Sequence, residues 1–162
     1  MNSKNTNILC PVDQKRILVI GGTGFPCTNI VKKLWDEGHS ISIFNRGNNN
    51  QIWDDYNPRI QTLIGDRTDI STFFRLQHHV WLRNEASIPW DVIIDSGFAV
   101  DVDAVQNIIN VIGCDIEHYV FISSKVCSIP EKDTPLNYKL YRNIKLECEE
   151  RVKEFYNEKH LI

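Results

Sequence analysis

Short apolar runs alternate along the chain with longer stretches in which apolar residues recur at every third or fourth position. The short runs predict buried β-strands, and the longer stretches predict helices that each bury one face. Strands are expected at residues 15–22, 40–45, 59–64, 91–95 and 118–123. Helices are expected at residues 28–38, 70–83, 102–112 and 137–158, with a polar loop at 46–57. The apolar face of the last helix is expected to comprise Tyr141, Ile144, Cys148, Val152 and Phe155. Apolar strands that alternate with helices indicate an α/β fold, in which helices cover both faces of a doubly wound parallel sheet.

Length and charge limit what such a sheet can do. A chain of 162 residues is expected to form a single domain with a sizeable core. The formal charge of −3 argues against a nucleic-acid binder or a protein of anionic membranes, because such proteins carry a basic excess. No apolar run approaches the ~20 residues that a membrane helix needs. We therefore expect partners other than nucleic acid or membrane.

Cysteine usage and the first residues add two further expectations. The five cysteines are irregularly spaced, which predicts neither a disulfide framework nor a zinc site and favours a reducing, cytoplasmic compartment. Neighbouring His78 and His79 would point apart on a helix, so no metal site is expected. The polar start of the chain predicts a flexible leader over residues 1–14, followed by one folded domain over 15–162.

Glycines fill the turn between the first strand and the first helix. Gly21, Gly22 and Gly24 allow a backbone to pass close to a pyrophosphate, which then lies at the positive end of the helix. A tight turn without a ligand explains the same glycines, but the place of this turn in the chain favours a dinucleotide. Cys27 stands where the usual fingerprint has a third glycine, and we expect it to push the helix outward or to weaken binding.

The end of the second strand carries Asn45 and Arg46, where a site that prefers NAD offers a carboxylate to the ribose 2′-hydroxyl. An arginine at this place can pair with a 2′-phosphate, so the sequence favours NADP over NAD. The alternative is that Arg46 only caps an exposed loop.

Acid–base groups are expected near the end of the chain. Tyr141 and Lys145 are four residues apart on a helix and share a face, where the ammonium group lowers the pKa of the phenol. Such a tyrosine can act as a general acid or base. Ser123 and Ser124 follow the fifth strand, at the edge where open α/β sheets bind ligands, and a hydroxyl there can bind a substrate oxygen. The alternative makes both serines turn residues and Tyr141 an aromatic at the core edge.

Five motifs in this order resemble the extended short-chain dehydrogenase/reductase family, and within it the NAD(P)-dependent epimerases and dehydratases. They are GGTGF at 21–25, FNRG at 44–47, GDRTD at 65–69, ISS at 122–124 and YRNIK at 141–145. The resemblance implies a Rossmann-type sheet from residue 15 onward. It also implies that Asp66 and Arg67, after the third strand, flank adenine, and that Ser96 and Gly97, after the fourth strand, pass the nicotinamide ribose. The residues that it implies for the pyrophosphate are those of the glycine turn: Gly21, Gly22, Thr23, Gly24 and Phe25.

The resemblance further implies that Tyr141 is the catalytic acid or base, that Lys145 lowers its pKa and binds the ribose, and that a serine orients the substrate. The segment ISSKVC is one residue shorter than the pattern ISSxxVY of the family. Counting from the strand favours Ser124 and counting back from Val126 favours Ser123, so both serines stay candidates. The implied activity is an NADP-dependent oxidoreductase that acts on a nucleotide sugar.

The chain ends about one helix after Lys145, whereas members of the family continue into strands and a C-terminal region that form most of the substrate pocket. We therefore expect a sheet that is incomplete on its C-terminal side, without a substrate domain. Its free edge is expected to recruit a second copy or a missing C-terminal partner chain. The alternative function is a non-catalytic dinucleotide-binding or regulatory module.

Overall fold

A parallel sheet of five strands, in the order β3-β2-β1-β4-β5, forms the centre of the computed structural model. The structure describes residues 13–49, 52–54, 60–69, 71–72, 90–96, 101–112 and 116–155. The strands are β1 (Arg16–Ile20), β2 (Ser40–Asn45), β3 (Ile60–Ile64), β4 (Val92–Asp95) and β5 (His118–Phe121). All four neighbouring pairs run parallel, which confirms the doubly wound α/β fold.

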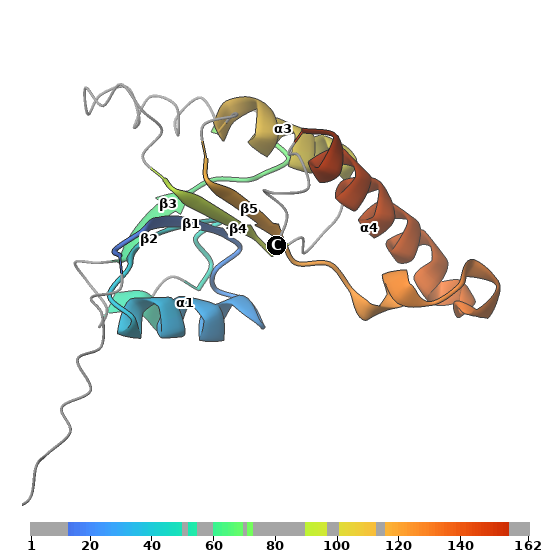
Figure 1. Cartoon of the computed structure of the whole chain (residues 1–162), viewed down its shortest axis with the longest axis horizontal. Coiled ribbons are helices and arrows are strands. Elements are labelled where there is room, and N and C mark those ends of the chain that lie inside the picture. Colours follow the sequence, from blue (N-terminus) through green and yellow to red (C-terminus); the bar gives the residue numbers. More distant parts are fainter. Residues whose placement is uncertain are drawn as a thin grey trace, which may run out of the picture.

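Helices cover both faces of this sheet, as expected from strands that are apolar throughout (Figure 1). On one face lies α1 (Cys27–Asp36), and on the other lie α3 (Val102–Ile112) and α4 (Leu136–Phe155). Two short 3-10 turns, η2 (Lys125–Ser128) and η3 (Glu131–Asp133), connect β5 to α4. Of the helix expected at 70–83, residues 71–72 are helical and the remainder lies outside the described residues.

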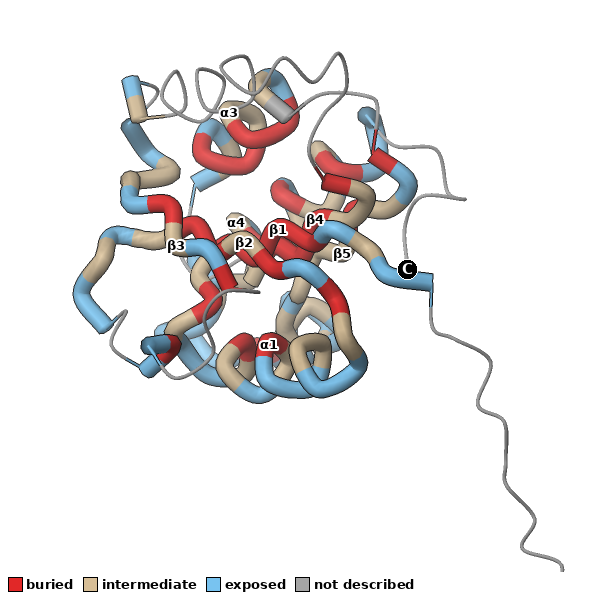
Figure 2. The backbone as a smooth tube through the Cα atoms, turned by 90° about the vertical axis from the view of Figure 1, so that its left-hand side faces the viewer, coloured by how far each residue is buried: buried red, intermediate tan, exposed pale blue. Residues whose placement is uncertain are grey.

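Each face of the sheet has its own apolar cluster, and the buried parts of the backbone lie between the helical layers (Figure 2). Val31 of α1 contributes to one cluster, together with the first residue of that helix, Cys27. Val105 of α3 and Val152 of α4 contribute to the other. The Cys27 side chain is therefore accommodated within the core on the α1 side.

Two sequence expectations about burial are wrong. Trp53 is buried in the α1-side cluster, although it lies in a segment expected to be a polar loop. Tyr141 and Phe155 are 37% and 51% exposed, while Lys145 is buried on the inner face of α4. In Figure 1 the first half of α4, which carries Tyr141, extends beyond the sheet, whereas Phe155 is the last residue of the helix. Within the described residues, no helix combines the length and the apolar character that a membrane span requires.

Candidate functional site

A cavity of about 520 Å³ opens at the carboxyl ends of β1 to β4. In the sheet, β1 lies between β2 on one side and β4 on the other, so the cavity is lined by residues from both sides of β1. Ligands bind at this place in open α/β sheets. Nine residues that the sequence assigned to a cofactor line the cavity: Gly21, Thr23, Gly24, Phe25, Asn45, Arg46, Asp66, Arg67 and Ser96. The sequence did not single out Ile20, Phe44, Asn48, Asn49, Gly65 and Thr68, which also line it. Gly97 lies outside the described residues.

The glycine turn is built for close approach. Gly21 has a φ of 83°, and a Cβ atom there would lie 2.5 Å from Ser96 Oγ, so any side chain would meet the end of β4. Gly22 is required for a different reason, because its Cβ would lie 2.9 Å from Ile43 Cγ2 under the turn. Gly21 thus leaves room above the strand ends, whereas Gly22 allows the turn to pack on β2.

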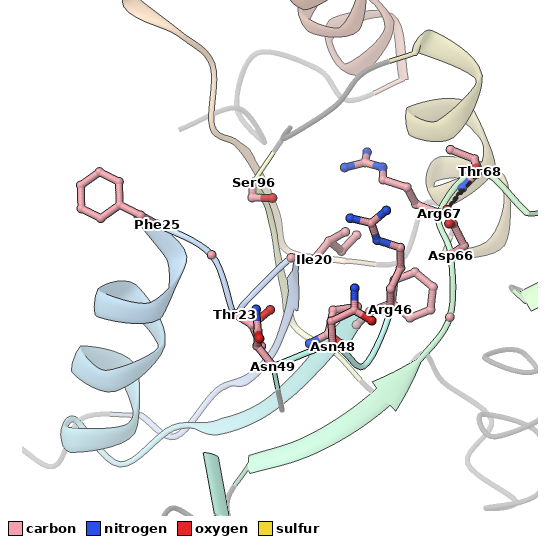
Figure 3. Close-up of a pocket in the computed structure, with 15 residues that line it drawn as sticks. Ile20, Thr23, Phe25, Arg46, Asn48, Asn49, Asp66, Arg67, Thr68 and Ser96 are labelled. Carbon is pink, nitrogen blue, oxygen red and sulfur yellow. Dashed lines mark hydrogen bonds between the residues drawn. The ribbon is translucent and has the colours of Figure 1, made fainter. Parts of the chain in front are cut away.

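Arg46 brings a positive charge to the cavity from the end of β2 (Figure 3). No ion pair of Arg46 is found within the described part of the chain. Asn45 beside it accepts a hydrogen bond from Gly47 N–H through Oδ1 at 2.6 Å, while its buried Nδ2 has no hydrogen-bond partner among the residues that the structure describes. The pKa of Asp66 is lowered because Thr68 donates two hydrogen bonds to its carboxylate, with smaller contributions from Arg46 and Arg67.

Arg67 reaches from the end of β3 to the end of β4, where it forms a buried ion pair. Its Nη1 and Nη2 each lie 2.8 Å from an oxygen of Asp95, which is 0% exposed and also accepts a hydrogen bond from Tyr119 Oη at 2.8 Å. Burial alone would lower the pKa of Arg67, but the charge and hydrogen bonds of Asp95 outweigh it and raise that pKa. Within the described part of the chain, the buried Nε of Arg67 has no hydrogen-bond partner. The sequence assigned Arg67 to adenine and missed Asp95, whose only signal is a carboxylate that ends an apolar strand.

Lys145 and Tyr141 lie together on α4. Lys145 is 3% exposed, and its Nζ donates a hydrogen bond to the carbonyl oxygen of Ile122 at 3.1 Å. The same Nζ lies 4.8 Å from the ring centroid of Phe121 and 5.9 Å from that of Tyr141. Burial lowers the pKa of Lys145, and the charge of Asp95 opposes that shift. Neither Tyr141 nor Lys145 is among the residues that line the cavity.

The two candidate serines have different partners. Ser123 Oγ donates a hydrogen bond to Glu149 Oε1 and lies 3.5 Å from Cys127 Sγ. Ser124 Oγ accepts a hydrogen bond from Val126 N–H at 3.4 Å and caps η2. Among the described residues, no hydrogen bond joins either serine to Tyr141. Glu149 was not predicted from the sequence, although its place four residues after Lys145 puts it on the same face of the helix.

The residues around the cavity suit the dinucleotide that the motifs imply. A glycine cradle stands beside the N-terminus of α1, Arg46 supplies a cation, and Asn45 Nδ2 and Arg67 Nε are buried donors without partners. The cavity volume also lies within the range of small-molecule sites.

Comparisons with known proteins identify the family of the chain. Residues 17–154 match the model of the NAD dependent epimerase/dehydratase family. A curated relative, the 3 beta-hydroxysteroid dehydrogenase/Delta 5→4-isomerase of Mycobacterium tuberculosis, is 30% identical over 120 residues, covering 67% of this chain and 31% of the relative.

Solved structures show the same fold. A short-chain dehydrogenase/reductase (wide type) from Veillonella parvula in complex with NADP has a TM-score of 0.66 at 13% identity, over 88% of this chain and 65% of the other. The Bordetella bronchiseptica enzyme WbmG in complex with NAD has a TM-score of 0.57 at 14% identity, over 86% of this chain and 50% of the other. The chain thus spans only part of the length of these proteins. Because the family model covers most of the chain, the chain belongs to the NAD dependent epimerase/dehydratase family.

Proposed function

We propose that this chain binds NADP and supplies acid–base groups for hydride transfer to or from a substrate carbon that carries a carbonyl or hydroxyl group. The observation that carries the proposal is the cavity at the strand ends, around which nine sequence-predicted cofactor residues meet. Bound NADP supplies the hydride chemistry through its nicotinamide ring. The glycine turn would hold the pyrophosphate, and Arg46 would pair with the 2′-phosphate.

In this proposal Tyr141 holds or releases the proton of the substrate oxygen. The Nζ atom of Lys145 lies 5.9 Å from the centroid of the Tyr141 ring, so the ammonium group stands next to the proposed acid or base. Ser124 binds the same substrate oxygen. The substrate class that we propose is a nucleotide sugar, on the resemblance of the motifs to those of epimerases and dehydratases.

A second candidate function, a non-catalytic dinucleotide-binding module, is favoured by three observations on the proposed catalytic residues. Lys145 Nζ is bonded to a backbone carbonyl, Ser123 is bonded to Glu149, and Tyr141 does not line the cavity. A protein of this kind would bind the dinucleotide and turn over nothing.

Calorimetric titration of the full chain with NADP and with NAD tests the cofactor proposal. We expect tighter binding of NADP, and we expect Arg46→Gln to weaken it by about 10- to 100-fold, the value of one or two charged hydrogen bonds. NAD affinity should stay unchanged. Arg151→Gln, which removes an exposed arginine of α4, is the matched control. Tighter binding of NAD, or an equal loss for both cofactors, would contradict the preference for NADP.

Turnover separates the two candidate functions. A panel of nucleotide sugars, followed by the absorbance of the reduced nicotinamide, should show hydride transfer with at least one substrate. NADP binding without turnover of any compound in the panel would favour the module.

We also propose that a second copy of the chain is a partner. Within the described residues β5 pairs with β4 alone, so β5 is an edge strand, and edge strands can pair with a strand of another chain. Sedimentation should show a dimer, and a stable monomer at all concentrations would refute this assembly.

A further inference from the structure

The segment that follows β5 is held by two residues of α4. The carbonyl oxygen of Ile122 accepts a hydrogen bond from Lys145 Nζ, and the hydroxyl of the next residue, Ser123, donates to the carboxylate of Glu149. Lys145 and Glu149 are four residues apart, so they project from the same face of the helix. Two consecutive residues of the segment are therefore attached to one face of α4.

The hydrogen atoms of the two serines are committed differently. A serine hydroxyl has one hydrogen to donate and two lone pairs that accept, whereas an ionised carboxylate only accepts. The hydrogen of Ser123 is thus directed to Glu149, and this serine has none left for a substrate carbonyl. Ser124 uses a lone pair to accept from Val126 N–H as the cap of η2, and this bond leaves its own hydrogen free to be donated.

The spacing along α4 leads to the same assignment. Glu149 is eight positions after Tyr141, which places their backbones about 12 Å apart along the helix axis. A serine that is bonded to Glu149 is therefore a poor partner for the phenol of Tyr141.

We propose that Glu149 is a positioning residue, which holds Ser123 and with it residues 122–124, so that Ser124 is the serine that donates to the substrate oxygen. The part of this inference that concerns the substrate rests on the proposed function. The part that concerns Glu149 does not, because it is a statement about the segment itself.

Cys127 offers a readout of the segment that does not need activity. Its Sγ lies 3.5 Å from Ser123 Oγ and is half-buried, so release of the segment should expose the thiol. In the full chain, peptide-level mass spectrometry should find faster alkylation of Cys127 and faster amide exchange over 122–127 in Glu149→Ala. Glu149→Gln keeps an acceptor oxygen and should remain close to the parent protein. Glu147→Gln changes an exposed carboxylate of the same helix and is the matched control.

Two results would overturn the role of Glu149. One is parent-like alkylation and exchange in Glu149→Ala, and the other is an equal change in Glu147→Gln. If Glu149→Ala does not fold, as judged by circular dichroism, Ser123→Ala breaks the same hydrogen bond from the other side and takes its place.

Kinetics with NADP and a substrate that is turned over test the assignment of the serines. Ser124→Ala should lower kcat by about 10²- to 10³-fold, as expected for the loss of one donor to the reacting oxygen, with KM nearly unchanged. Ser123→Ala should cost far less, and Ser123→Ala with Glu149→Ala should cost no more than Glu149→Ala alone. A larger loss in Ser123→Ala than in Ser124→Ala would overturn the assignment. If the parent protein binds NADP but turns over nothing, the proposed function fails, while alkylation and exchange still decide the role of Glu149.

Discussion

The cavity at the ends of β1 to β4 and the face of α4 that carries Tyr141 are built in different ways. Around the cavity, Asn45 Nδ2 and Arg67 Nε have no partners, and Arg46 brings a cation for which no ion pair is found within the described residues. On α4, by contrast, Lys145 is bonded to a backbone carbonyl and Glu149 to a serine. The residues around the cavity thus present polar groups to a ligand, whereas the polar side chains on α4 mostly form hydrogen bonds within the protein.

This difference has a structural origin. Hydrogen-bonded neighbouring strands fix the residues around the cavity, because each lining residue stands at the end of a strand or in the segment that follows it. The groups on α4 depend instead on the connection through η2 and η3 and on a helix whose first half leaves the sheet. Cofactor binding and catalysis should therefore respond separately to substitution.

The largest expected effect separates the two regions directly. Tyr141→Phe removes the proposed acid–base hydroxyl and should lower kcat by about 10²- to 10⁴-fold. The dissociation constant of NADP should not change, because Tyr141 does not line the cavity. Steady-state kinetics and calorimetry on the same preparation provide both numbers, with Tyr138→Phe as the control one turn earlier on the helix. A parallel loss of NADP affinity would show that the two regions are one site.

The ion pair between Arg67 and Asp95 connects the cavity to the end of β4, and breaking it should affect stability. Asp95→Ala leaves a buried guanidinium without its partner and should lower the free energy of unfolding by about 3–5 kcal/mol. The double variant Arg67→Met with Asp95→Leu should recover most of this loss, because no unpaired charge remains. Urea unfolding without cofactor measures both. A double variant as unstable as Asp95→Ala would show that the pair does more than balance charge.

A smaller effect concerns the thiol beneath the glycine turn. Burial, together with the charge of Asp95, raises the pKa of Cys27 from 9.0 to about 11, partly opposed by a hydrogen bond with Ser96. Above pH 9 the unfolded chain therefore loses this proton first, so the free energy of unfolding should fall by about 2–3 kcal/mol as the pH approaches 11. Cys27→Ala should lack that part of the fall, and unfolding curves at a series of pH values reveal the difference. If the free energy of unfolding of Cys27→Ala falls with pH as steeply as that of the parent protein, the thiol has the same pKa in the native and the unfolded state.

The smallest expected effect is that of Lys145 on the pH dependence of the free energy of unfolding. Its sign is opposite to that of Cys27. Because burial lowers the pKa of Lys145 below 10.5, the native state releases this proton before the unfolded chain does. The free energy of unfolding should thus rise with pH between the lowered pKa and 10.5. Lys145→Met should lack the rise, since its side chain has no proton to release. The same pH series measures it, and an identical slope in both proteins would contradict a lowered pKa.

Local patterns were enough to predict the fold. The apolar runs and the helical periodicity follow from burial on two faces of a sheet, and they located β2 and α3 to the residue. Burial that depends on distant segments could not be predicted in this way. Trp53 stands in a largely polar stretch of sequence, and the exposure of Tyr141 follows from the path of α4 past the sheet.

The candidate site shows the same division. Gly21 and Arg46 could be predicted because each stands directly after a strand, at the edge where ligands bind. Asp95 could not, because its partner Arg67 comes from 28 residues earlier and no spacing rule connects them. Glu149 could not either, since its role depends on the path that the chain takes between β5 and α4.

The central place of β1 sets the order in which the sheet can form. β1 is the first strand along the chain, and it pairs with β2 on one side and β4 on the other. Arg16 contacts Asp91 across 75 residues of sequence, so the second side of β1 stays open until much of the chain exists. Pairing between residues so far apart slows folding. During synthesis β1 therefore stays open on one side until β4 has been made, and Leu18 and Val19, which are fully buried in the folded chain, lack part of their packing until then.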